Sequence, residues 1–242
     1  MAILPTTAAF GQRKNSNVID VNKRALSGLF GFVLTMALCV LLSAWTFDYW
    51  RAWVLISVLF VSLLGITLYL MKNDQRLLER RLDAGPGAET QKSQKIGQLF
   101  GAIAFVATLV VPALDHRFGW SSVPAPVVIS GEVLVTVGLL IAFLVFRENT
   151  FTSATIEIAA EQRVVSSGLY STVRHPMYVG ALIMIFGIPL ALGSWWGTAT
   201  VVPMTLVIVR RVRDEEELLT RDLTGNREYR DQVRYRLLPF VW

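Results

Sequence analysis

Long apolar runs alternate along the chain with short polar segments, which is typical of a protein that crosses a membrane several times. A helix needs roughly 20 residues to cross a hydrocarbon core of about 30 Å. The runs that have this length are Ala25–Trp45, Trp50–Met71, Ile96–Leu114 and Val127–Phe146. We therefore expect an all-α fold, a polytopic membrane bundle that opens with four transmembrane helices.

A fifth apolar run, Met177–Val209, is too long for one span and is interrupted near Gly193–Trp196. This pattern predicts a helical hairpin whose turn carries aromatic residues at the membrane interface. Beyond Arg210 most residues are charged or polar, and Leu218, Leu219 and Leu223 recur at helical spacing. We expect an amphipathic tail helix on the cytoplasmic side.

These elements divide the chain into three parts, which are a cytoplasmic N-terminal segment (1–24), four transmembrane helices (25–146) and a core with a loop, the hairpin and the tail (147–242). A turn is expected at Gly85-Pro-Gly, within the second loop. Lys and Arg residues gather before the first run, in the second loop and after the hairpin, so both termini are expected in the cytoplasm. The first residues lack the short apolar core of a signal peptide, so we expect the first span to be retained.

Composition narrows the functional classes. The chain is 53% hydrophobic and 17% charged, which is too apolar for a soluble domain. Its net charge of +5 comes from residues that flank apolar runs, and this favours membrane topology over nucleic-acid binding. With Cys39, His116 and His175 as its complete set of cysteines and histidines, the chain offers no Cys- or His-based metal site.

The densest group of unusual residues is Gly168–Gly180, at the start of the hairpin. Pro176 suits the first turn of a helix, whose free N–H groups attract anions, and Arg174 and His175 add further donors. Each residue alone also fits a membrane anchor or an aromatic belt. A membrane anchor does not require arginine, histidine, proline and tyrosine within five residues, so the combination favours a functional site.

An acidic group follows the hairpin at Asp214–Glu217, close behind Arg210, Arg211 and Arg213. Taken alone, this group is typical of a solvated helix with i,i+4 ion pairs. A hairpin, however, brings its two ends together, so the Arg-His-Pro segment and the acidic run are expected to be neighbours. Such a site can bind a polar cofactor on one side and a lipophilic substrate on the other.

The segments Arg174-His-Pro-Met-Tyr-Val-Gly180 and Glu215-Glu-x-x-Leu219-x-x-x-Leu223 resemble the isoprenylcysteine carboxyl methyltransferase family. The likeness covers about the last hundred residues. These residues resemble the bacterial branch of the family, which implies that the protein lies in a bacterial inner membrane. It implies an all-helical membrane enzyme that binds S-adenosyl-L-methionine in a cytoplasmic pocket. One departure is Leu223-Thr-Gly225, where the family often has Phe-Gly or Leu-Gly.

The resemblance also implies roles for individual residues. Arg174 and Arg211 would be catalytic, with Arg211 facing the polar group of the substrate. The residues that would bind the cofactor are Gln162, Arg163, Val164, Val165, Tyr170, His175, Pro176, Met177, Tyr178, Glu215 and Glu216. The expected substrate is a lipophilic small molecule or a lipid, with no nucleic acid, no metal and no obligatory protein partner. Whether the methyl acceptor is a carboxylate, a thiol or an amine stays open.

Two alternatives remain. Membrane sterol-type reductases have a similar C-terminal helical core but use NADPH, and Arg210, Arg211 and Arg213 could bind its 2′-phosphate. A transporter or scaffold, which is not an enzyme, would need ionisable residues in the middle of its spans. Only Glu132 comes close to this condition, so the sequence gives little support to the second alternative.

Overall fold

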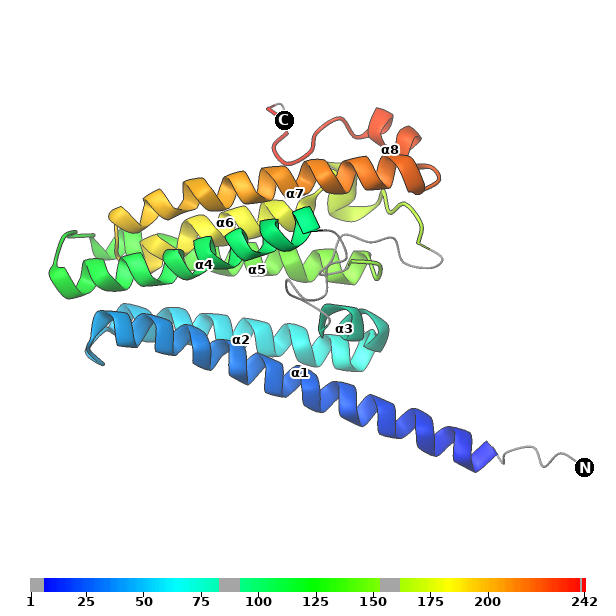
Figure 1. The fold of residues 1–242 in the computed structure, drawn as a ribbon, viewed down its shortest axis with the longest axis horizontal. Helices are drawn as coiled ribbons and strands as arrows, with labels where there is room; N and C mark the ends of the chain where they lie inside the picture. The colour runs from blue at the N-terminus through cyan, green and yellow to red at the C-terminus, as the bar shows by residue number, and fades with distance from the viewer. Residues whose placement is uncertain (1–6, 83–91, 153–161, 240) are drawn as a thin grey trace, which may run out of the picture.

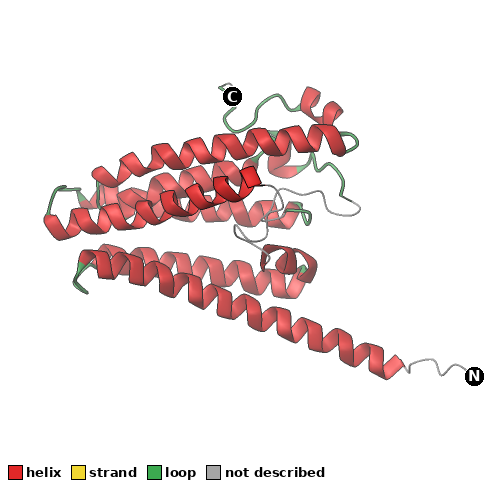
Figure 2. Ribbon diagram, in the orientation of Figure 1, coloured by secondary structure: helices red, strands yellow, loops and turns green. Residues whose placement is uncertain are grey.

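A computed structural model describes residues 7–82, 92–152, 162–239 and 241–242, and the expected turn at Gly85 lies outside them. These residues form helices and no strands, so the all-α prediction is confirmed (Figure 2). The helices are α1 (Thr7–Ala44), α2 (Trp50–Asn73), α3 (Gln75–Leu82), α4 (Lys92–Phe118), α5 (Ala125–Glu148), α6 (Pro176–Ala191), α7 (Val201–Asp222) and α8 (Asn226–Gln232), with 3-10 turns η1 (Gly168–Ser171) and η2 (Trp196–Thr200).

Four helices are long and apolar enough to cross a membrane, which marks the chain as an integral membrane protein. Their apolar segments are Val18–Ala44, Trp50–Asn73, Lys95–Phe118 and Ala125–Glu148. All four predicted spans are therefore confirmed, with ends that differ from the prediction by up to seven residues, the largest difference being at the start of the first span.

The hairpin is formed by α6 and α7, and its turn includes Gly193 at a φ of +73°, a conformation that glycine adopts without strain. One detail differs from the prediction. No boundary at Arg210 separates the hairpin from a tail helix, because α7 runs unbroken from Val201 to Asp222. Between Met204 and Asp222 the sequence has neither glycine nor proline, so nothing interrupts the helical hydrogen bonds where the apolar residues give way to charged ones.

The helices form two groups, with α1, α2 and α3 on one side and α4 to α7 on the other (Figure 1). The connections lie at two ends of the bundle. One end, which we call the turn end, holds the links α1–α2, α4–α5 and α6–α7. The opposite end, the motif end, holds α3, η1 and α8 (Figure 1).

Glycines bring α5 and α6 into backbone contact along their length. Gly138 on α5 faces Gly180 on α6, and a Cβ on Gly138 would lie 2.5 Å from the Gly180 carbonyl oxygen. The same holds at Gly187, where a Cβ would lie 2.7 Å from the carbonyl oxygen of Gly131. Close backbone approach at small residues is a common way for membrane helices to associate. It fixes the beginning of α6 beside the last turns of α5, where the polar residues gather.

At the turn end, a buried carboxylate joins two loops. The side chain of Asp115 on α4 accepts hydrogen bonds from the hydroxyl groups of Ser121 (2.6 Å) and Ser194, and from the Ser121 backbone N–H (2.7 Å). The Tyr49 hydroxyl donates to the Leu192 carbonyl oxygen at 2.6 Å. The turn of the hairpin is thereby attached to α2 and α4.

Candidate functional site

The segment before α6 is held by the C-terminal part of the chain. The backbone N–H of Arg174 donates to the Tyr235 carbonyl oxygen (2.9 Å), and that of His175 donates to the Arg236 carbonyl oxygen (3.0 Å). Helix α6 then begins at Pro176, as the sequence predicts. These two bonds fix the direction in which the side chains of Arg174 and His175 leave the backbone.

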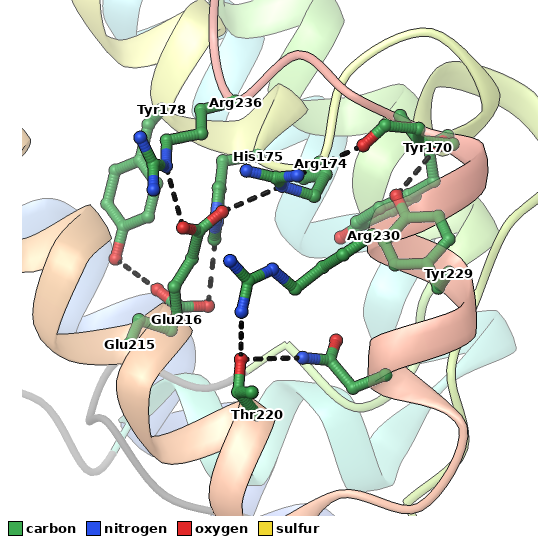
Figure 3. A network of polar contacts seen from close by, with 12 residues as sticks. Tyr170, Arg174, His175, Tyr178, Glu215, Glu216, Thr220, Tyr229, Arg230 and Arg236 are labelled. Carbon is green, nitrogen blue, oxygen red and sulfur yellow. Dashed lines mark hydrogen bonds and ion pairs between the residues drawn. The ribbon is translucent and has the colours of Figure 1, made fainter.

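Glu216 on α7 is the centre of an ionic cluster (Figure 3). Its Oε1 accepts from Nε of Arg174 at 2.7 Å and lies 3.3 Å from Nε2 of His175, while its Oε2 accepts from Nε of Arg236 at 2.7 Å. The residue is 6% exposed. Burial of the carboxyl raises its pKa, but the hydrogen bonds from His175 and Arg236 and the charge of Arg174 outweigh this and lower the pKa to about 2.

A second chain of polar contacts crosses between α7 and α6. Nε of Arg211 donates to the Tyr178 hydroxyl at 3.1 Å, and this hydroxyl donates to Oε2 of Glu215 at 2.7 Å. Oε1 of Glu215 lies 4.0 Å from Nδ1 of His175. The predicted meeting of the Arg-His-Pro segment and the acidic run is therefore confirmed, because both glutamates contact residues at the start of α6.

A cavity of about 490 Å³ opens at this place. Of the residues selected from the sequence, it is lined by Gln162, Arg163, Val164, Val165, Tyr170, Arg174, His175, Pro176, Met177, Tyr178, Arg211 and Glu215. Its volume lies in the usual range for small-molecule sites, roughly 300–1,000 Å³. Glu216, which the resemblance also implies as a cofactor-binding residue, does not line the cavity but lies behind its wall. The reason is that its carboxylate points toward Arg174 and Arg236 (Figure 3).

Two tyrosines and an asparagine are joined by hydrogen bonds in the wall of the cavity. The Tyr170 hydroxyl accepts from Nδ2 of Asn149 at 3.0 Å, and the Tyr229 hydroxyl donates to the Tyr170 carbonyl oxygen at 2.7 Å. Burial raises the pKa of both tyrosines above the ordinary value, to about 12 for Tyr229, so both hydroxyls keep their protons at neutral pH. They act as fixed hydrogen-bonding groups in the wall.

The sequence did not single out several residues that line the cavity, among them Arg81, Asn149, Phe151 and Asn226. Asn149 and Phe151 lie within the last hundred residues, which the family resemblance covers, but the resemblance gave them no role. Arg81 is one of the cations of the second loop from which the membrane topology was predicted. No sequence signal separated it from its neighbours.

The two parts of the cavity differ in chemistry. Arg174, His175, Tyr178 and Glu215 contribute polar side chains to the lining. Apolar side chains come from Leu63 and Ile66 of α2, Leu139 and Ala142 of α5 and Met184 of α6. A polar group and a lipophilic group can therefore lie side by side within one space.

Residues 126–227 match the phospholipid methyltransferase family model. The matched region extends from α5 to the beginning of α8 and contains both glutamates and the whole Arg-His-Pro-Met-Tyr segment. The match supports a membrane methyltransferase. It leaves out α1 to α4, and with them the side chains that α2 and α3 contribute to the cavity.

A curated protein also matches. The chain is 29% identical over 137 residues to the delta(14)-sterol reductase TM7SF2 of Mus musculus. The alignment covers 49% of this chain and 33% of the reductase, so the chain spans about a third of that relative's length.

Proposed function

We propose that this protein is an integral membrane methyltransferase that uses S-adenosyl-L-methionine and acts on a lipophilic acceptor. The observation that carries the proposal is the cavity in which the Tyr178–Glu215 wall and an apolar wall from α2 and α5 face one shared space. The phospholipid methyltransferase match supports it. In this proposal the motif end and both termini face the cytoplasm of a bacterial cell.

The residues of the cavity fit the chemistry of the proposed cofactor. Glu215 and the Tyr178 hydroxyl offer oxygen atoms to an ammonium group, and His175 offers a donor to a carboxylate. Val164, Val165, Leu219 and Leu223 offer apolar surface to a flat heterocyclic ring. When bound, the cofactor supplies an electrophilic methyl group.

The protein's own contribution to the reaction is mainly alignment. Positioning two reactants in one orientation can supply on the order of 7–11 kcal/mol of a barrier. Arg211 holds the Tyr178 hydroxyl from one side and Glu215 accepts from it on the other, so the tyrosine ring keeps one orientation in the cavity. Behind it, Glu216 fixes Arg174 and His175. The apolar wall excludes water from the place where an acceptor would lie.

Isothermal titration calorimetry on the detergent-purified protein tests the proposal. We expect S-adenosyl-L-methionine to bind the wild-type chain, and His175→Ala and Glu215→Ala to abolish binding. Incubation with cofactor labelled in its methyl group and a lipid extract should transfer the label into an organic-soluble product. No binding by the folded wild-type protein would refute the proposed function.

A second candidate is an NADPH-dependent membrane reductase, and the similarity to the delta(14)-sterol reductase favours it. Of the three arginines that the sequence offers to a 2′-phosphate, only Arg211 lines the cavity. Nε of Arg210 lies 4.0 Å from Asp214, and the Arg213 guanidinium lies over the Trp242 ring. A thermal-shift comparison decides: a larger rise in melting temperature with NADPH than with S-adenosyl-L-methionine would favour the reductase.

A further inference from the structure

Helix α3 is a short cationic helix whose position at the motif end is fixed from several sides. Its first turn is capped by Asp74, whose Oδ1 accepts from the Leu77 backbone N–H at 2.9 Å. Leu77 and Leu78 are 0% and 4% exposed, in a cluster that includes Phe146 of α5. Nη1 of Arg80 donates to the Thr150 carbonyl oxygen at 2.8 Å. Helix α3 is thus attached both to the first helix pair and to the segment that follows α5.

This attachment directs Arg81, the next residue on α3, into the cavity. The Arg81 guanidinium lies over the Phe146 ring, 5.1 Å from its centroid, and the residue lines the cavity together with Arg211. Burial lowers the pKa of Arg81; the nearby Tyr178 raises it, and the charge of Arg211 lowers it. Two guanidinium groups from opposite halves of the sequence therefore line the same cavity, both within electrostatic reach of Tyr178.

The lining of the cavity favours a negatively charged group at this place. Among the lining residues that the structure describes, Arg81, Arg163, Arg174 and Arg211 are cationic and Glu215 is acidic. The charge of Arg174 is balanced by Glu216, which lies behind the cavity wall. The apolar residues Leu63 and Ile66, on α2, which packs against α3, line the cavity as well. A molecule with an anionic head and an apolar tail matches this combination.

We propose that Arg81 is a specificity-determining residue that holds, together with Arg211, an anionic oxygen group, carboxylate or phosphate, of the lipophilic acceptor. This inference rests on the proposed function, whose acceptor it narrows. It concerns a residue outside the region that matches the methyltransferase family model. Guanidinium groups bind both kinds of oxyanion through paired hydrogen bonds, so the shared chemistry of carboxylate and phosphate is what the site recognises.

Binding of matched sixteen-carbon probes tests the inference. Radiolabelled palmitate is bound to the full-length protein in detergent, and unlabelled palmitate, hexadecyl phosphate and palmitamide compete for it. We expect palmitamide, which has the same chain but no charge, to compete roughly tenfold less well than palmitate, the effect of losing one charge-assisted hydrogen bond. The two anionic probes distinguish a preference for carboxylate from one for phosphate.

Variants assign the effect to one residue. Arg81→Gln should remove the preference for charged probes, and Arg81→Lys should restore part of it, because lysine keeps the charge but loses the planar fork. Arg76→Gln is the matched control, since Arg76 is an exposed arginine on the same helix that does not line the cavity. It should behave like the wild type. Melting temperatures of all variants show whether they are folded.

The outcomes separate the inference from the proposed function. Cofactor binding to the wild type, measured by calorimetry, is the test of the proposed function. A wild type that binds the cofactor but treats palmitate, hexadecyl phosphate and palmitamide alike would overturn the inference alone. So would a loss of preference that is equal in Arg81→Gln and Arg76→Gln, or a folded Arg81→Gln that retains the preference.

Discussion

The two ends of the bundle each bury a carboxylate, but they surround it with different partners. At the turn end, Asp115 is 1% exposed and accepts from serine hydroxyls and a backbone N–H. At the motif end, Glu216 is 6% exposed and accepts from two arginines and faces a histidine. The second carboxylate stands behind the wall of the cavity. The neutral donors around Asp115 join two loops. The cationic partners of Glu216 are themselves held in fixed positions beside the cavity.

The largest expected effect distinguishes these two carboxylates. Glu216→Gln leaves Arg174 buried without its anionic partner, and breaking such a buried pair typically costs about 3–5 kcal/mol. Asp115→Asn keeps an acceptor oxygen for its hydroxyl partners and should cost about 1–3 kcal/mol. Reversible unfolding in mixed micelles measures both values. Equal losses for the two variants would show that the ionic partners add nothing to the motif end.

Acid should weaken the motif end in a defined pH range. The pKa of Glu216 is lowered from its ordinary value of 4.5 to about 2 in the folded protein, so its stabilising contribution is complete above pH 4.5 and is lost as the pH falls toward 2. The contribution is on the order of 3 kcal/mol. We expect the melting temperature of the wild type to fall across this range more than that of Glu216→Gln, as measured by differential scanning fluorimetry. Parallel curves for the two proteins would contradict this assignment.

A smaller effect separates two tyrosine hydroxyls that lie at opposite ends of the bundle. Tyr178→Phe removes the group between Arg211 and Glu215, and we expect roughly tenfold weaker cofactor binding by calorimetry. Tyr49→Phe removes the bond to the Leu192 carbonyl oxygen and should lower stability by about 1 kcal/mol while cofactor affinity stays unchanged. If Tyr49→Phe weakened cofactor binding as much, the two ends would not be functionally distinct.

Much of the fold could be predicted because hydropathy alone determines where long helices cross lipid. The four spans follow from run length, and the hairpin follows from an apolar run with a break at Gly193–Trp196. From the hairpin, in turn, the meeting of Arg174–Tyr178 with the acidic run could be inferred. These steps need only the local pattern and the connectivity of the chain.

What could not be predicted depends on how each helix is rotated against its neighbours. Glu215 and Glu216 are identical and adjacent, yet one lines the cavity and the other lies behind its wall. Their sequence holds no sign of which is which. Arg81 shows the same limit of prediction from sequence. A cation on a short helix after a span is interpreted as a sign of membrane topology, whether its side chain points to water or into a cavity.

The backbone bonds that Arg174 and His175 donate to Tyr235 and Arg236 have a consequence for biosynthesis. The ribosome releases Arg174 and His175 well before Tyr235 and Arg236, and α6 and α7 are synthesised in between. Ligand affinity should therefore emerge late and abruptly in a series of nascent chains of increasing length. The earlier helices would assemble first, and the pocket would mature only after Tyr235 and Arg236 have left the exit tunnel.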